Sequence, residues 1–410
     1  MVENEGPSTG GNSDAADDTA SGAPDGAPSA SRTFPVVGLG ASAGGLQALR
    51  SFFAAAPDDS GMAYIVVVHL ASDKPSMLPE LLQKSTSLTV LMATDGQRIA
   101  PNNVYVVPPD HEIRLKDTTI LFSQVIQDGS LHTIDRFFRS LAEDQGIRAA
   151  AILLSGSGAD GSVGIRDVKG AGGMVLAQSP ETAQYTSMPQ SAVETGDVDR
   201  VLAPELMPEE LQRYFSRYIA AVEKVVSEGD AQKAWLNRIF NLLRAEVGHD
   251  FSNYKSNTLL RRIGRRIGLK QIEDNDAYLQ LLRDDAEERR ALFHEMLIGV
   301  TSFFRDPESF AVLQKEVLPR LLDKMEDDQV LRAWVPGCST GEEVYSLAMV
   351  LAESMDAVGK RAHLQLFGTD VDARAVQKAR EGRYPASIAS DVSRQRLKRF
   401  FTKEENSYLI

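Results

Sequence analysis

The stretch VVGLGASAGGLQALRSFF, residues 36–53, decides the fold of the first domain because it joins an apolar strand, a glycine-rich turn and the start of a helix. Gly38, Gly40 and Ala43 fit the G-x-G-x-x-A loop that binds a dinucleotide. The overlapping run GASAG, with Ser42 at its centre, fits the G-x-S-x-G turn that exposes a nucleophilic serine. These two interpretations predict different chemistry, and the following strands distinguish them.

Residues 34–203 alternate short apolar runs with helical stretches. Runs such as AYIVVVHL (residues 63–70) and RAAAILLSGSG (residues 148–158) are typical of strands that are buried on both faces of a parallel sheet. The helices between such strands cover both faces of the sheet. We therefore predict an α/β domain with a doubly wound parallel sheet over residues 34–203.

The end of the second predicted strand argues against dinucleotide binding. That strand should end in Asp or Glu to hold the ribose hydroxyls, but it ends in His69, and Asp58 and Asp59 precede it. A serine hydroxyl needs an imidazole to accept its proton and a carboxylate to hold that imidazole. Ser42, His69 and Asp160 each follow a predicted strand and should meet at one edge of the sheet. We therefore predict a Ser-His-Asp triad.

Each of these three residues also has an ordinary structural interpretation. Ser42 could cap the following helix, His69 could be a hydrogen-bonded histidine at a strand end, and Asp160 could cap the helix after it. If the triad is correct, the backbone N–H of Ala43 is the expected oxyanion donor. The remaining histidines show no paired ligand spacing, and we predict no metal site. They are His111, His132, His249, His294 and His363.

Composition limits the classes of function. The 57 acidic and 44 basic residues of this 410-residue chain give a net charge of -13, which argues against nucleic-acid or membrane-surface binding. The single cysteine, Cys338, suits a reducing compartment. Residues 1–33 have little to bury and should form a disordered acidic tail, and no apolar run reaches the roughly 18 residues of a membrane helix. We expect a cytoplasmic location without membrane insertion.

The first domain resembles a known family in four runs: VVGLGASAGG, VVVHL, LLSGSGADGSVGI and MVLAQSPETAQYTSMPQSAVETGDVDRVL. They are similar to the catalytic domain of the chemotaxis protein-glutamate methylesterases (CheB type). That family hydrolyses glutamate methyl esters, and deamidates certain glutamines, on methyl-accepting chemoreceptors. The resemblance covers about residues 34–202 and implies no cofactor for this domain.

The resemblance places the family's catalytic residues on Ser42, His69 and Asp160, and a second backbone oxyanion donor on Ser157. The family often has Thr at Ala43 and Met at Ser157. Because both positions act through the backbone in the family, we expect activity to survive. The family's usual receiver domain has no counterpart in the acidic tail, so we do not expect phosphorylation control of that kind.

The second half of the chain is first helical and then α/β. We predict a helical connector over residues 204–231, an all-α subdomain over residues 232–325, and a partial Rossmann-like domain over residues 326–410. Within DFSNYKSN, Ser and Asn should cap a helix that begins near Thr258. Only two strands of the last domain precede Ile410, so we expect the sequence to be cut short.

The loop VPGCSTGEE, residues 335–343, joins the first of these strands to a helix. Asp370 ends the next strand, 33 residues after Gly337, where an adenosine ribose would be held. The loop has too few glycines for a pyrophosphate, which favours a nucleoside cofactor without phosphates. The alternative is a turn with an ordinary acidic cap. Cys338 is expected to be a small loop residue and not a nucleophile.

This half resembles the chemotaxis receptor methyltransferases (CheR type), which use S-adenosylmethionine. The resemblance rests on YKSNTLLRRIGRRIGLKQI, YLQLLRDD, LFHEMLIGVTSFFRDPESF and AWVPGCSTGEEVYSLAM. It implies cofactor contacts by Thr301, Arg305, Glu342 and Asp370, with Arg305 pairing the methionine carboxylate. Gly299 and Val344 replace the family's common Asn and Pro.

Four arginines recur at helical spacing: Arg261, Arg262, Arg265 and Arg266. They form either a solvated face or a surface that docks an acidic receptor helix.

From both halves of the chain together, we predict a fused chemosensory methylesterase and methyltransferase that acts on methyl-accepting chemoreceptors or related signalling proteins. The alternatives are a non-catalytic scaffold that retains both folds and a serine esterase that acts on other esters.

Overall fold

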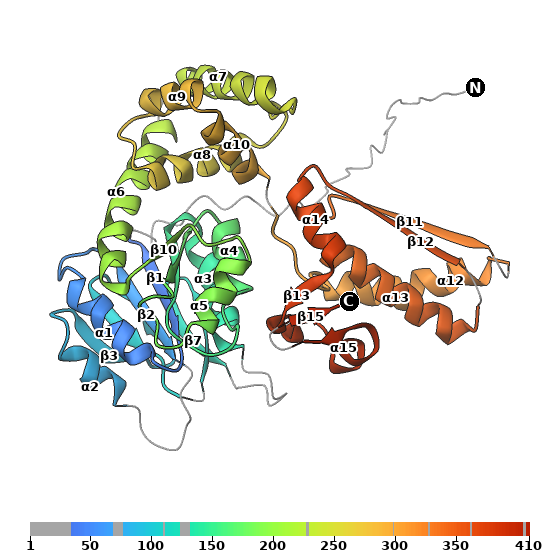
Figure 1. The fold of residues 1–410 in the computed structure, drawn as a ribbon, viewed down its shortest axis with the longest axis horizontal. Helices are drawn as coiled ribbons and strands as arrows, with labels where there is room; N and C mark the ends of the chain where they lie inside the picture. Colours follow the sequence, from blue (N-terminus) through green and yellow to red (C-terminus); the bar gives the residue numbers. More distant parts are fainter. Residues whose placement is uncertain are drawn as a thin grey trace, which may run out of the picture.

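The structure is a computed structural model. It describes residues 34–68, 77–109, 111–123, 132–226, 229–297, 299–326, 329–360, 363–404 and 407–410. Figure 1 shows an α/β domain in blue to green, a group of helices in yellow-green to brown, and a second α/β domain in orange to red.

The first domain is built on a parallel sheet. Within the described residues the sheet has seven strands in the order β10-β9-β8-β1-β2-β5-β3. The strands are β1 (Val36–Ala41), β2 (Ala63–Val68), β3 (Thr89–Met92), β5 (Asn103–Val106), β8 (Ala149–Leu153), β9 (Met174–Gln178) and β10 (Arg200–Leu202). The chain extends the sheet in opposite directions from β1, so the predicted doubly wound fold is confirmed, with a switch point between β1 and β8.

Helices cover both faces of this sheet. One face packs against α1 (Gly45–Ala55), α2 (Leu78–Gln83) and the first half of α6 (Met207–Val226). The other face packs against α3 (Thr133–Gln145), α4 (Gly164–Gly170) and α5 (Ser187–Glu194). The two apolar layers make the strands buried on both sides, as their continuous apolar runs predict.

The glycines of the opening stretch serve helix packing. Gly38 and Gly40 lie inside β1 and are buried. A Cβ added at Gly38 would lie 2.7 Å from Phe137 Cε1, and one added at Gly40 would lie 2.7 Å from Ile134 Cγ2. Both glycines therefore let α3 approach the strand closely, so the dinucleotide-loop interpretation of these positions is wrong.

A small antiparallel sheet was not expected from the sequence. Its strands are β4 (Gln97–Arg98), β6 (Glu112–Lys116) and β7 (Thr119–Ser123), in the order β4-β7-β6. Asp117 and Thr118 turn the β6–β7 hairpin with positive φ angles of 50° and 58°. Such angles suit hairpin turns and favour residues such as Asp.

The all-α part follows α6 along the chain. Its helices are α7 (Gly229–Val247), α8 (Ser256–Lys270), α9 (Asn275–Asp284) and α10 (Ala286–Met296). The predicted connector, which contains α6, packs against both the first domain and α8. Tyr214 on α6 is buried in the core of the first domain, and Tyr218 on α6 donates its O–H to Arg261 O of α8 at 3.2 Å. Helix α8 has Lys255 as its N-cap and no side-chain cap, so the predicted Ser or Asn cap is wrong.

The second α/β domain contains the two predicted strands. β11 (Val330–Pro336) pairs in parallel with β12 (His363–Thr369), and α13 (Glu342–Val358) and α14 (Ala373–Glu381) follow them. An antiparallel sheet of β13 (Arg383–Pro385), β15 (Ser407–Leu409) and β14 (Thr402–Lys403) was not predicted. The remaining helices are α11 (Pro307–Val312), α12 (Leu318–Asp323) and α15 (Arg394–Phe400). Among the helices in the described ranges, none is long and apolar enough to cross a membrane.

The arginines of α8 join the domains. Arg265 is fully buried, and it binds Asp199 Oδ2 at 2.5 Å, Glu295 Oε2 at 2.6 Å and Gly173 O at 2.9 Å. Arg262 binds Glu295 at 3.3 Å and Lys169 O at 2.8 Å. Arg266 pairs with Glu288, and only Arg261 of the four is exposed, so the solvated-face interpretation is wrong. The receptor-docking interpretation stays a prediction.

We expect Gly40→Ala to destabilise the first domain by about 1–3 kcal/mol, because the added methyl group overpacks the contact with α3. Urea unfolding measures the change. The double variant Gly40→Ala/Ile134→Ala should lose less stability than the two single variants added together, because the second change frees the space. Strict additivity would contradict the close-packing account.

Candidate active site

The Ser42 turn is fixed against the loop that follows β8. Ser42 N donates to Ser155 O at 3.0 Å, and Ser155 Oγ donates to Ala43 O at 2.9 Å. Leu154 N also donates to Gly40 O at 2.9 Å. These bonds hold the turn at the carboxyl edge of the sheet, beside the switch point.

The Ser42 hydroxyl is not used as a helix cap. The N-cap of α1 is Gly44, with a φ of 73°, and no side chain caps that helix. Within the part of the chain that the structure describes, Ser42 Oγ has no hydrogen-bond partner. A Cβ added at Gly156 would lie 3.0 Å from Ser42 Cβ, so a glycine keeps the space beside the serine open. The N-cap interpretation of Ser42 is therefore wrong.

The two predicted oxyanion donors lie in these two loops. Among the described residues, neither the Ala43 N–H nor the Ser157 N–H has a protein acceptor. The loop around Ser157 is held in place because Gly156 N donates to Tyr185 O and Gly158 N donates to Ser187 Oγ, both at 3.1 Å. Fixed and uncommitted N–H groups are what an oxyanion site requires.

Asp160 caps a helix, but not the one that follows it. Its buried carboxylate accepts the N–H groups of Ile134 and Asp135, both at 3.0 Å, at the start of α3. In return, Asp135 Oδ1 accepts the N–H groups of Val163 and Gly164 at 2.9 Å and 2.7 Å, at the start of α4. The two carboxylates thus cap each other's neighbouring helix, which fixes Asp160 in position.

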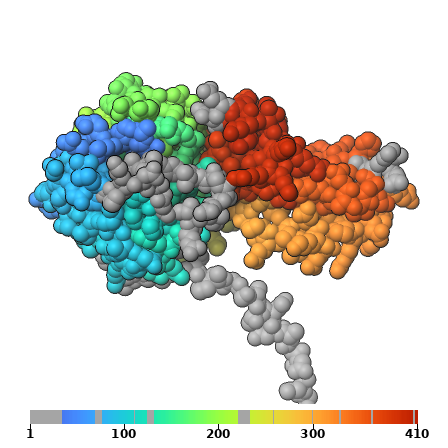
Figure 2. All heavy atoms as spheres, turned by 90° about the horizontal axis from the view of Figure 1, so that it is seen from below, coloured from blue at the N-terminus to red at the C-terminus, as the bar shows by residue number. Residues whose placement is uncertain are grey.

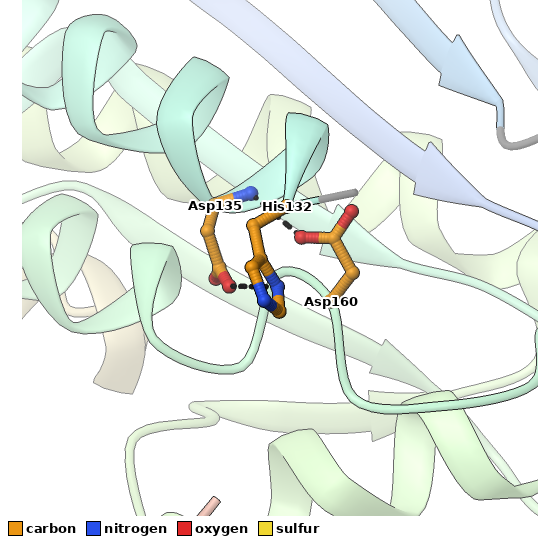
Figure 3. A group of neighbouring side chains, drawn as sticks. All are labelled: His132, Asp135 and Asp160. Atoms are coloured by element: carbon orange, nitrogen blue, oxygen red, sulfur yellow. Dashed lines mark hydrogen bonds and ion pairs between the residues drawn. The ribbon is translucent and has the colours of Figure 1, made fainter. Parts of the chain in front are cut away.

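Among the described residues, the imidazole of His132 lies next to these carboxylates. Figure 3 shows the carboxylate of Asp135 turned toward His132, with Asp135 Oδ2 at 3.9 Å from His132 Nδ1. The predicted triad histidine, His69, lies outside the described residues and follows in sequence directly after β2, the strand that pairs with β1. The triad therefore stays a prediction.

His132 and Asp135 are residues that the sequence interpretation missed. The only signal was an acidic residue in the first turn of an amphipathic helix. One donor atom each of His132, Asp135 and Asp160 lies within 4.8 Å of the others. Three protein ligands fall short of the four that a structural zinc site uses, and three of the four carboxylate oxygens already accept backbone N–H groups. We assign the cluster a positioning role.

The neighbouring carboxyl groups of Asp135 and Asp160 predict that the stability of the fold depends on pH. Burial, and then the charge of Asp160, raise the pKa of Asp135 well above its usual range. The folded chain thus holds this proton more tightly than the unfolded chain, so stability is lost as pH rises from about 4 through the raised pKa. We expect Asp135→Asn to become more stable relative to the native chain over that rise, measured by urea unfolding.

The matched variant Asp135→Ala removes the acceptor of two buried N–H groups. Relative to Asp135→Asn, it should lose about 1–3 kcal/mol for each of them at every pH, because both variants lack the titrating carboxyl group. A stability difference for Asp135→Asn that does not change with pH would contradict the assignment.

The second candidate site lies at the loop between β11 and α13. Asp370 accepts the N–H of Ser339 and the N–H of Asp372, both at 2.8 Å, and so ties the loop to the end of β12. A cavity of about 590 Å³ is lined there by Gly337 and Asp370, and from the helical side by Tyr254 and other residues. The structure therefore brings the predicted glycine and the predicted ribose-binding acid together.

The other predicted cofactor contacts do not line this cavity. Glu342 is buried and accepts from Thr340 Oγ1 at 2.6 Å and from Arg166 Nη1 at 3.0 Å. Arg305 is exposed and donates to Val300 O at 2.8 Å, and Thr301 is half-buried. Their cofactor roles stay predictions. No local sequence pattern indicates that Arg166, on α4 of the first domain, would bind Glu342.

Comparison with known proteins identifies the domains. The chain matches, in order, the CheB methylesterase family over residues 37–211, the CheR methyltransferase all-alpha domain over residues 234–297, and the CheR methyltransferase SAM binding domain over residues 299–410. The chain therefore combines a CheB methylesterase domain with both domains of a CheR methyltransferase. Both family resemblances are confirmed.

Several known proteins are similar to this chain. It is 34% identical over 354 residues to an uncharacterized 104.1 kDa protein of Rhodobacter capsulatus, which covers 81% of this chain and 37% of that protein. It is 36% identical over 185 residues to protein-glutamate methylesterase/protein-glutamine glutaminase 6 of Anaeromyxobacter dehalogenans, which covers 43% and 53% of the two chains. The chain spans about half or less of these relatives.

Among solved structures, the CheB methylesterase catalytic domain of Thermotoga maritima is 30% identical, with a TM-score of 0.42. The match covers 44% of this chain and 98% of that one.

Proposed function

We propose that this chain is a bifunctional enzyme that removes and adds methyl esters on glutamate side chains of methyl-accepting chemoreceptors. The observation that supports the first activity most directly is the uncommitted Ser42 hydroxyl on a fixed strand-to-helix turn, within a CheB methylesterase domain. The second activity is supported by the cavity at Gly337 and Asp370 within the CheR methyltransferase SAM binding domain.

In the proposed hydrolysis, Ser42 Oγ attacks the ester carbonyl carbon while His69 accepts its proton. Asp160, held by the cap on α3, orients that imidazole. The N–H groups of Ala43 and Ser157 stabilise the oxyanion. Methanol leaves with the proton from the imidazolium, and water then releases the glutamate carboxylate. The same residues can hydrolyse a glutamine side-chain amide, which releases ammonia.

In the proposed methylation, S-adenosylmethionine supplies the methyl group when it is bound. Asp370 is placed to accept hydrogen bonds from ribose hydroxyls. The acceptor glutamate is ionised at neutral pH because its pKa is about 4.3, so the reaction needs alignment more than a general base. Thr301, Arg305 and Glu342 would complete the cofactor contacts. The receptor partner and a cytoplasmic location remain part of this proposal.

We expect Ser42→Ala to abolish methanol release from methylated receptor while the thermal unfolding temperature stays unchanged. The matched control is Ser51→Ala on α1, because the Ser51 hydroxyl has no hydrogen bond among the described residues, and this variant should keep full activity. Unchanged methanol release by Ser42→Ala would refute the nucleophile. If the native chain releases nothing from any receptor but hydrolyses small esters, the general serine esterase is correct.

For the second site, calorimetric titration with S-adenosylmethionine should detect binding to the 410-residue chain. Asp370→Asn should weaken this binding by roughly tenfold or more, because one charge-assisted hydrogen bond contributes about 1.5–3 kcal/mol. Glu343→Gln, which changes an exposed acid of α13, is the control and should bind normally. Absence of any binding would favour the scaffold for this half.

A further inference from the structure

Helix α4 of the methylesterase domain contacts the SAM binding domain. Figure 1 shows α4 and α14 on the sides of the two α/β domains that face each other, and Figure 2 shows these domains in contact. Arg166 on α4 binds Glu342, the first residue of α13, and Lys378 on α14 donates to Thr195 O of the first domain. Specific polar contacts therefore hold the two domains together.

The residues expected to contact the cofactor divide into two groups. Gly337 and Asp370 line the cavity of about 590 Å³, where the ribose would bind. Glu342 and Arg305 do not line that cavity, and both are charged. The amino-acid end of S-adenosylmethionine carries one ammonium and one carboxylate group. By charge, Glu342 suits the ammonium and Arg305 suits the carboxylate.

The first domain already occupies the carboxylate of Glu342. Its Oε1 accepts from Arg166 Nη1 at 3.0 Å, and its Oε2 accepts from Thr340 Oγ1 at 2.6 Å. The side chains of Arg166 and Glu342 are only 15% and 3% exposed. A carboxylate buried to this extent needs a cation beside it, because an unpaired buried charge is strongly unfavourable. Since two cations repel each other, the cofactor ammonium would have to displace the Arg166 guanidinium.

The next residue of α4, Asp167, faces Arg305. Burial raises the pKa of the Asp167 carboxyl, and the charges of Arg139 and then of Arg305 oppose that rise. Arg305 Nη1 also donates to Val300 O at 2.8 Å. Val300 packs against the end of α4, because a Cβ added at Gly170 would lie 3.4 Å from Val300 Cβ. The segment that contains Arg305 thus lies against the same helix as Glu342.

We propose that α4 is an autoinhibitory element of the methyltransferase, in which Arg166 and Asp167 face the two residues that would bind the charged amino-acid end of S-adenosylmethionine. This inference rests on the proposed methyltransferase function. Cofactor binding requires α4 to release Glu342, so the affinity is reduced by the fraction of chains in which the contact is closed. Because such coupling is reciprocal, the bound cofactor weakens the contact between the two domains by the same factor.

The first test locks α4 in place without changing a charged residue. In Gly170→Cys/Val300→Cys, the Cβ separation of 3.4 Å is close to that of a disulfide, and the change at Val300 removes the methyl group that a Cβ at Gly170 would meet. In calorimetric titration with S-adenosylmethionine, the oxidised variant should bind at least roughly tenfold more weakly than the same variant after reduction. Val300→Cys alone is the control and should bind equally under both conditions.

The second test removes the cation that occupies Glu342. Arg166→Gln should bind S-adenosylmethionine roughly fivefold or more tightly, which is the size of a typical coupling between sites. Asp197→Asn is the matched control, because it removes the other carboxylate partner of Arg166, at 3.1 Å, and leaves the contact with Glu342 in place. This control should not tighten binding. Thermal unfolding shows that each variant is folded.

The third test uses the native chain. Bound S-adenosylmethionine should raise the amide hydrogen exchange of residues 164–170, measured by mass spectrometry, because α4 leaves its contact with the SAM binding domain. A ligand that only stabilised the fold would lower this exchange.

Three results would overturn the inference: equal affinity of the oxidised and reduced double variant, unchanged or weaker binding by Arg166→Gln, or unchanged or slower exchange of α4 with the cofactor bound. If the native chain and every variant bind the cofactor equally, only this inference fails. If no form of the chain binds the cofactor, the proposed methyltransferase function fails as well.

Discussion

The position of the candidate esterase site depends on two carboxylates that cap each other's helices. Asp160 accepts the first N–H groups of α3, and Asp135 accepts those of α4. Since the first-turn N–H groups of a helix have no partner inside it, a carboxylate there is both a hydrogen-bond acceptor and a favourable charge. The exchange locks the loop after β8 to the face of the sheet that α3 covers. That loop in turn holds the turn of Ser42.

A second constraint joins the two enzyme modules. Arg265 is fully buried and binds one carboxylate from each side of the boundary, Asp199 and Glu295. Removing one partner of such a buried pair leaves an uncompensated charge, which is strongly unfavourable. The basic helix α8 therefore packs inside the molecule and is not a free surface. Arg166 and Glu342 continue the contact toward the proposed cofactor site. The modules share a boundary, and a cavity of about 840 Å³ lies on it.

The sequence predicted the features that depend on local pattern. Apolar runs located β1, β2 and β8, and the strand ends placed Ser42 and Asp160 in the loops that follow two neighbouring strands, β1 and β8. Short strands of mixed polarity, such as β4 and β14, carry too little periodicity to be recognised. Contacts between residues that are far apart in the sequence could not be predicted from it. Asp160 was interpreted as a possible cap for the helix that follows it, but it caps α3. No sequence pattern around Arg265 indicates that it binds Asp199. Such contacts depend on which elements the fold brings together.

The central claim is that Ser42 is an activated nucleophile. It is tested most directly by reaction with a fluorophosphonate, in which a serine oxygen displaces fluoride at phosphorus, followed by mass spectrometry of the digested chain. The account predicts one adduct per chain, on the peptide that contains Ser42, and none on Ser42→Ala. An unreactive native chain, or an adduct on another residue that survives in Ser42→Ala, would contradict it.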